Sequence, residues 1–168
     1  LLISAAPDIL KKNPTASFVI VGADGAGESG YTDQMKCMAQ KNKVLDHFIF
    51  LGKRDDIPEV MNTFDLLVVP SRAEPFGKVI IEAMACNKCV IASEVGGIPE
   101  ILIDGENGLL VPSEDIEALK TAILKVIENK EFANNLANNG LSTVRDHFSI
   151  DALVNKTQQL YSNLIKDQ

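Results

Sequence analysis

Short apolar runs that alternate with helical segments constrain the fold of this chain more than any other feature of its 168 residues. Almost every side chain in these runs is apolar, so a strand formed there is buried on both faces. Such strands are typical of a parallel sheet with helices on both sides. We therefore predict an α/β fold, with strands at residues 18–21, 48–52, 66–69, 89–92 and 108–111 and helices at 32–43, 57–64 and 79–87.

The last third of the sequence has a helical pattern. Ser113 is a good N-cap, because its hydroxyl can accept from a free helix amide, and two acidic residues follow it in the first turn. Apolar residues then recur at helical spacing through residues 116–127, 132–144 and 150–164. We find no internal repeat or linker, and the length suffices for one domain with its own core. We predict a single domain over residues 1–168, entered partway along a helix at its first residues.

The charge balance excludes some classes of partner. The formal net charge is −7, and the cationic residues form only short pairs such as Lys11-Lys12 and Lys53-Arg54. A protein that binds nucleic acid or anionic membrane through bulk charge needs a basic stripe, which this sequence lacks. No run of about 18 apolar residues occurs, so we also expect no transmembrane helix. Nucleic acid is therefore not an expected partner.

The cysteines favour a reducing compartment. There are three, at Cys37, Cys86 and Cys89, and this low, odd number argues against a disulfide scaffold. We therefore expect a cytoplasmic protein. Cys86 and Cys89 have the spacing of a redox or zinc motif, but no second Cys or His pair completes a metal site. We interpret them as small apolar residues at a helix–strand junction.

Two glutamates flank the predicted start of a helix. Glu74 lies in the loop after the strand at 66–69, and Glu82 lies on the helix that begins near Lys78. A helix start presents free N–H groups that attract phosphate, and a carboxylate can accept from two neighbouring hydroxyls. Together these groups suit a sugar nucleotide. Taken singly, each glutamate would more often be a solvated surface residue.

Two glycine-rich segments also follow predicted strands. The segment at residues 22–27 has the spacing GxxGxG rather than GxGxxG, and no acidic residue ends the next strand, so it favours a plain turn over a dinucleotide site. Gly96 and Gly97 precede Pro99 and form either an amide-rich turn on the ligand-binding edge or a plain connection. His47 and His147 have no partner in sequence that suggests catalysis, and we interpret both as structural or exposed.

Several segments resemble one enzyme family. Glu74-Pro75-Phe76-Gly77, Glu82-Ala83-Met84-Ala85 and Gly96-Gly97-Ile98-Pro99-Glu100 are similar to the donor-binding half of retaining glycosyltransferases of family 4. The resemblance runs nearly the whole length of the chain. It implies a Rossmann-like parallel sheet flanked by helices, which is one half of a GT-B architecture. Asn87 and Cys89 depart from the Gly and Pro that the family usually carries.

The resemblance also implies a role for each site residue. Glu74 would be catalytic and would bind hydroxyls of the transferred sugar, while Glu82 would hold the ribose. The remaining candidates contact the donor mainly through backbone: Phe76, Gly77, Lys78 and Val79 for sugar and diphosphate, Gly52, Lys53 and Arg54 for the base, and Gly96 and Gly97 as further candidates. No metal or other cofactor is expected, because a helix dipole and cations replace the metal in this architecture.

The resemblance further implies partners. An N-terminal acceptor domain and the first strand of this domain would precede Leu1, together with the Arg and Lys that clamp the diphosphate. We therefore expect the chain alone to bind a nucleotide sugar weakly and to transfer no sugar, and we expect any peripheral membrane association to involve the N-terminal domain. Two alternatives remain open: a GT-B nucleotide-sugar epimerase, and a non-enzymatic Rossmann-like module that binds a nucleotide or sugar.

Overall fold

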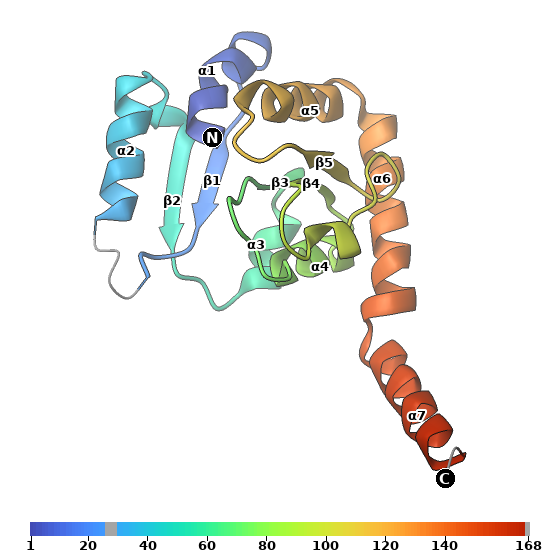
Figure 1. Cartoon of the computed structure of the whole chain (residues 1–168). Coiled ribbons are helices and arrows are strands. Elements are labelled where there is room, and N and C mark those ends of the chain that lie inside the picture. The colour runs from blue at the N-terminus through green and yellow to red at the C-terminus, as the bar shows by residue number, and fades with distance from the viewer. Residues whose placement is uncertain (26–29, 167–168) are drawn as a thin grey trace.

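Parallel strands connected by helices form the body of the molecule in a computed structural model that describes residues 1–25 and 30–166 (Figure 1). The N-terminal half contains α1 (Leu2–Lys12), β1 (Phe18–Val21), α2 (Tyr31–Lys41), the 3₁₀ turn η1 (Leu45–His47), β2 (Phe48–Gly52), α3 (Ile57–Asn62) and β3 (Leu66–Val69). The C-terminal half contains α4 (Lys78–Ala85), β4 (Cys89–Ser93), the 3₁₀ turn η2 (Ile98–Glu100), β5 (Leu109–Val111), α5 (Ile116–Glu128), α6 (Lys130–Thr143), the π-helical turn η3 (Val144–Phe148) and α7 (Ile150–Lys166).

The predicted strands are confirmed to within one residue, and the α/β architecture with parallel strands is confirmed with them. The strands do not form one continuous sheet, however. Among the described residues, β1 pairs only with β2, while β3, β4 and β5 form a second sheet in that order. Every pair is parallel. Strand–helix alternation specifies parallel strands, but which strand edges meet depends on tertiary packing.

The core has two layers, one on each side of β4. Along this strand, Cys89 and Ile91 belong to one hydrophobic cluster, and Val90 and Ala92 belong to the other. Successive side chains of a strand point to opposite faces, so a strand that lies between two cores must be apolar throughout. The first cluster also draws on α1, α5, α6 and both strands of the smaller sheet, and therefore joins the two sheets. The second cluster contains α4 and η2.

One predicted helix start was wrong. Ser113 does not cap α5; Asp115 does, and its Oδ1 accepts from the Ala118 amide at 2.9 Å. The Ser113 hydroxyl instead donates to the carbonyl of Ser71 at 3.4 Å. The chain turns at Glu114, whose φ of 63° lies in the left-handed region, so the helix can begin only after that turn.

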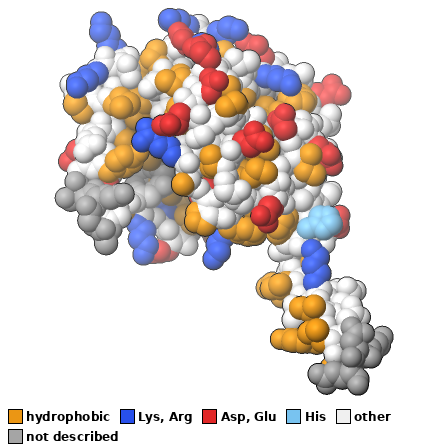
Figure 2. All heavy atoms as spheres, in the orientation of Figure 1, with side chains coloured by type: hydrophobic (Ala, Val, Ile, Leu, Met, Phe, Trp, Pro, Cys, Tyr) orange, Lys and Arg blue, Asp and Glu red, His pale blue; other side chains and the backbone are white. Residues whose placement is uncertain are grey.

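The C-terminal helix α7 projects away from the body (Figure 1). Figure 2 shows hydrophobic side chains along this helix. The exposed fraction exceeds one half at Ile150, Leu153, Leu160 and Ile165. In the described part of the chain, no helix has both the length and the apolar content needed to cross a membrane.

Candidate functional site

The loop between β3 and α4 carries the first predicted site residue. Glu74 is half-buried there, and its Oε1 accepts from the Gly77 amide at 3.1 Å. Gly77 is buried, has a φ of 96° and stands immediately before the first residue of α4. Glycine adopts this left-handed conformation without steric cost, so the chain can turn sharply from loop to helix. The carboxylate therefore lies at the start of α4, as the sequence predicted.

Within the described residues, the N-terminal end of α4 has backbone amides for which no hydrogen-bond acceptor is found. The Ile80 amide donates to the Gly77 carbonyl at 2.9 Å, and the Gly77 amide donates to Glu74. Among the described residues, no acceptor is found for the amides of Lys78 and Val79. The first amides of a helix have no partner within it and lie at the positive end of its dipole. This helix start can thus accept an anionic group.

Glu82 lies in the second turn of α4, as predicted, and is exposed. The helix buries Ile80, Ala83 and Met84 against the second cluster. Lys78 and Glu82, four residues apart, lie on the opposite, solvent-facing side. The strand–loop–helix unit thus presents both carboxylates and the open helix start.

Gly96 and Gly97 pack closely against the backbone of the Glu74 loop. A Cβ on Gly96 would lie 2.0 Å from the carbonyl oxygen of Glu74, and one on Gly97 would lie 2.6 Å from that of Pro75. The Gly97 amide donates to the Glu74 carbonyl at 3.3 Å. The sequence left open an amide-rich turn on the ligand-binding edge or a plain connection, and in the structure this turn packs backbone to backbone against the Glu74 loop. Only glycine permits such an approach.

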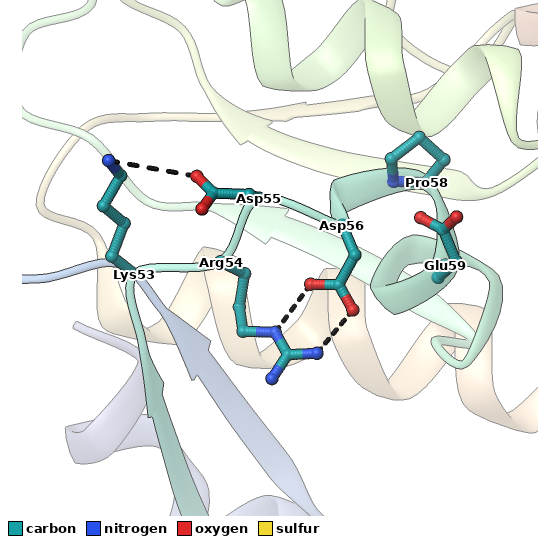
Figure 3. Close-up of a pocket in the computed structure, with 6 residues that line it drawn as sticks. All are labelled: Lys53, Arg54, Asp55, Asp56, Pro58 and Glu59. Carbon is teal, nitrogen blue, oxygen red and sulfur yellow. Dashed lines mark hydrogen bonds and ion pairs between the residues drawn. The ribbon is translucent and has the colours of Figure 1, made fainter.

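Lys53 and Arg54, in the turn that follows Gly52, line a hollow of about 740 Å³ (Figure 3). Lys53 lies 3.9 Å from Asp55, and the Arg54 guanidinium contacts both carboxylate oxygens of Asp56, with Nε to Oδ1 at 2.7 Å. The hydrogen bonds from Arg54 lower the pKa of the Asp56 carboxyl, and the same pairing raises the pKa of Arg54. The guanidinium is therefore engaged within its own turn.

The structure gives Asp24, in the loop after β1, a role that the sequence interpretation did not assign. Asp24 accepts from the Gly30 amide at 2.8 Å, from the Thr32 amide at 2.9 Å and from the Thr32 hydroxyl. These bonds, led by that from the hydroxyl, lower the pKa of Asp24. Residues 26 and 27 of the glycine-rich segment lie outside the described residues. A carboxylate that caps a helix from several residues upstream has no short sequence signature.

Asn107 is a second residue to which the sequence interpretation assigned no role. It is 3% exposed, accepts from the Ile103 amide at 2.7 Å, and donates to the Ile101 carbonyl and the Thr143 hydroxyl. It ties the end of α6 to the turn before β5. Its position next to Gly108 and a strand is the only sequence signal that could have suggested a turn role.

The structure agrees with the interpretation of the two histidines as structural or exposed residues and of Cys89 as a small apolar residue. His47 Nδ1 lies 3.0 Å from the Ala16 carbonyl, and His147 is exposed. Burial raises the pKa of the Cys89 thiol to about 11, which makes it a poor nucleophile. Within residues 1–25 and 30–166, no three His, Cys, Asp or Glu side chains gather as metal ligands would.

Comparisons with known proteins place the chain in a family. Residues 1–143 match the family model described as glycosyl transferases group 1. An uncharacterised glycosyltransferase of Methanocaldococcus jannaschii is 42% identical over 71% of this chain and 34% of its own length. The lipopolysaccharide core biosynthesis mannosyltransferase LpcC of Rhizobium leguminosarum is 30% identical over 99% of this chain and 47% of its own length.

A crystal structure of Anabaena Alr3699/HepE in complex with UDP superimposes with a TM-score of 0.87 at 31% identity, over 98% of this chain and 44% of that one. The chain thus spans less than half the length of these similar proteins. The match to the family model covers most of the chain, including the Glu74 loop and α4. The chain therefore belongs to the family of group 1 glycosyl transferases.

Proposed function

We propose that residues 1–168 form the donor-binding domain of a retaining glycosyltransferase of family 4 with GT-B architecture. One observation carries the proposal: Glu74, the open start of α4 and Glu82 lie on a single strand–loop–helix unit. Structures similar to this chain hold UDP and UDP-glucose, which supports a nucleotide sugar as the ligand.

Each group has a separate role in this proposal. The open amides and the dipole of α4 stabilise the diphosphate without a metal. Glu82 accepts from the ribose hydroxyls, and Glu74 accepts from hydroxyls of the transferred sugar close to the reacting carbon. Because Asp56 engages the Arg54 side chain, the turn at Gly52 and Lys53 contributes mainly backbone to the base site.

The complete protein would transfer a sugar from a nucleotide diphosphate to an acceptor, with retention at the anomeric carbon. An N-terminal domain would bind the acceptor and complete the cleft, and binding energy would go into placing the donor and stabilising the leaving diphosphate. The chain alone would bind the donor weakly and transfer nothing. A reducing, cytoplasmic location suits its thiols, which form no disulfide.

Calorimetric titration of the chain with UDP-glucose, GDP-mannose and ADP-glucose tests the proposal. We expect saturable binding of at least one of them, and we expect Glu82→Ala to weaken it about tenfold or more, because charge-assisted hydrogen bonds to the ribose are lost. Glu131→Ala, which removes an exposed glutamate from the first turn of α6, is the matched control and should leave affinity unchanged.

The same titration separates the alternatives. Binding of free nucleotide or free sugar that is indifferent to Glu82 would favour a non-enzymatic module and contradict the proposal. In the complete enzyme, Glu74→Ala should lower kcat with less effect on donor affinity. Interconversion of two nucleotide sugars without an acceptor would indicate an epimerase instead.

A further inference from the structure

An aromatic contact joins the Glu74 loop to the turn between α6 and α7. The rings of Phe76 and Phe148 meet edge to face, with centroids 6.3 Å apart and planes at 63°. Phe76 remains 39% exposed, whereas Phe148 is half-buried and packs against the second hydrophobic cluster. The better-anchored ring therefore belongs to Phe148, and the contact constrains Phe76 more than it constrains its partner.

The backbone of Phe76 is held on another side by the glycine turn. A Cβ on Gly97 would lie 3.2 Å from the Phe76 Cα, so the two backbones are already in close contact. The next residue, Gly77, donates its amide to Glu74 and precedes the open amides of α4. Phe76 is thus held between Gly97 and the Phe148 ring, directly before the groups that the proposed function assigns to the donor.

Phe148 ends an unusual segment. Residues Val144–Phe148 form a π-helical turn between α6 and α7, and this turn packs against α4. Isolated π-helical turns are rare and occur frequently at functional sites. Helix α7 begins two residues later, at Ile150, and projects from the body (Figure 1).

We propose that Phe148 is a positioning residue for the donor loop. Its ring sets the orientation of Phe76 and, through the backbone, the directions of the Gly77 and Lys78 amides. It has no contact with the donor itself. The positioning role rests on the proposed function, because it concerns the same loop. The dependence of the loop conformation on Phe148 holds whether or not a donor binds there.

Amide hydrogen exchange of the full chain, followed residue by residue by NMR, tests this dependence without any ligand. Phe148→Leu keeps apolar bulk but removes the ring, and we expect exchange at Gly77, whose amide donates to Glu74, to rise about two- to tenfold, the range that loss of an aromatic pair implies. Phe148→Tyr keeps the ring and should restore protection.

Phe132→Leu is the matched control. This aromatic lies on α6, under the Lys125 ammonium at 4.3 Å and packed against the first cluster, away from the loop. It should lower the melting temperature without changing exchange at Gly77. Equal loop exchange in wild type and Phe148→Leu would overturn the proposal.

A variant on the loop side covers the case in which Phe148→Leu fails to fold. Phe76→Leu, at an exposed position, should also raise exchange at Gly77, and adding Phe148→Leu should raise it little further, because both remove one contact. Unchanged exchange in Phe76→Leu would likewise overturn the proposal. If exchange responds but no nucleotide sugar binds, the positioning role stands and the proposed function fails.

Discussion

The loops after β1 and after β3 differ in how their carboxylates bind the start of the next helix. Each follows the carboxyl end of a parallel strand and leads into a helix, and in each a carboxylate accepts from an amide at or next to the helix start. Asp24 accepts hydrogen bonds from two backbone amides and one hydroxyl at the start of α2, whereas Glu74 accepts one hydrogen bond, from the amide that precedes α4.

The difference concerns the amides that each carboxylate occupies. Asp24 occupies the Gly30 and Thr32 amides at the start of α2, so an anion that binds those two amides would have to displace Asp24. The start of α4 keeps two amides without a described acceptor, and its loop is supported by Gly96, Gly97 and Phe148. A helix start attracts phosphate only where its own side chains leave amides free.

The largest effect that we expect comes from the support behind the Glu74 loop. Gly96→Ala must bring a Cβ against the Glu74 carbonyl and also strains a φ of +53°. Strain and overpacking together should cost roughly 2–4 kcal/mol of unfolding free energy, measured in urea. Gly105→Ala is the control, because Gly105 has a φ of +73° but nothing within 4 Å of a Cβ. An equal loss in both variants would show that the close contact contributes nothing.

A smaller effect separates the two carboxylates directly. Asp24→Ala removes three hydrogen bonds and Glu74→Ala removes one, so Asp24→Ala should lower the melting temperature by several degrees and Glu74→Ala by less. Calorimetric melting of both variants at neutral pH measures this. The reverse order would mean that the loop after β3, rather than the loop after β1, depends on its carboxylate cap.

The smallest effect is a pH dependence confined to the loop after β1. Hydrogen bonds lower the pKa of Asp24 in the folded state, so its charged form stabilises the fold. This contribution is complete above the unfolded pKa, about 3.9, and is lost as pH falls through the folded value. Wild type should therefore exceed Asp24→Asn in melting temperature at pH 6, and the gap should close below about pH 4. A gap that stays equally large below pH 4 would contradict this prediction.

Local patterns determined the elements of this protein. Apolar runs such as Leu66–Val69 specified strands because a strand between two helical layers has no polar face. The sequence also predicted where residues lie within an element. Glu74 falls in the loop and Glu82 in the second turn of α4, because the start of the helix sets the position of every later residue. Resemblance of short motifs to a family then suggested the donor site.

Tertiary structure decided what depends on residues far apart in sequence. The separation into two sheets, the cap at Asp115 in place of Ser113 and the closure of α2 by Asp24 depend on which groups the folded chain brings together. The contact of Phe148 with Phe76 spans the loop and the α6–α7 junction, and the glycine turn at Gly96 and Gly97 reaches a backbone about twenty residues upstream. Periodicity reports which face of an element is buried, but only packing determines which partner lies against it.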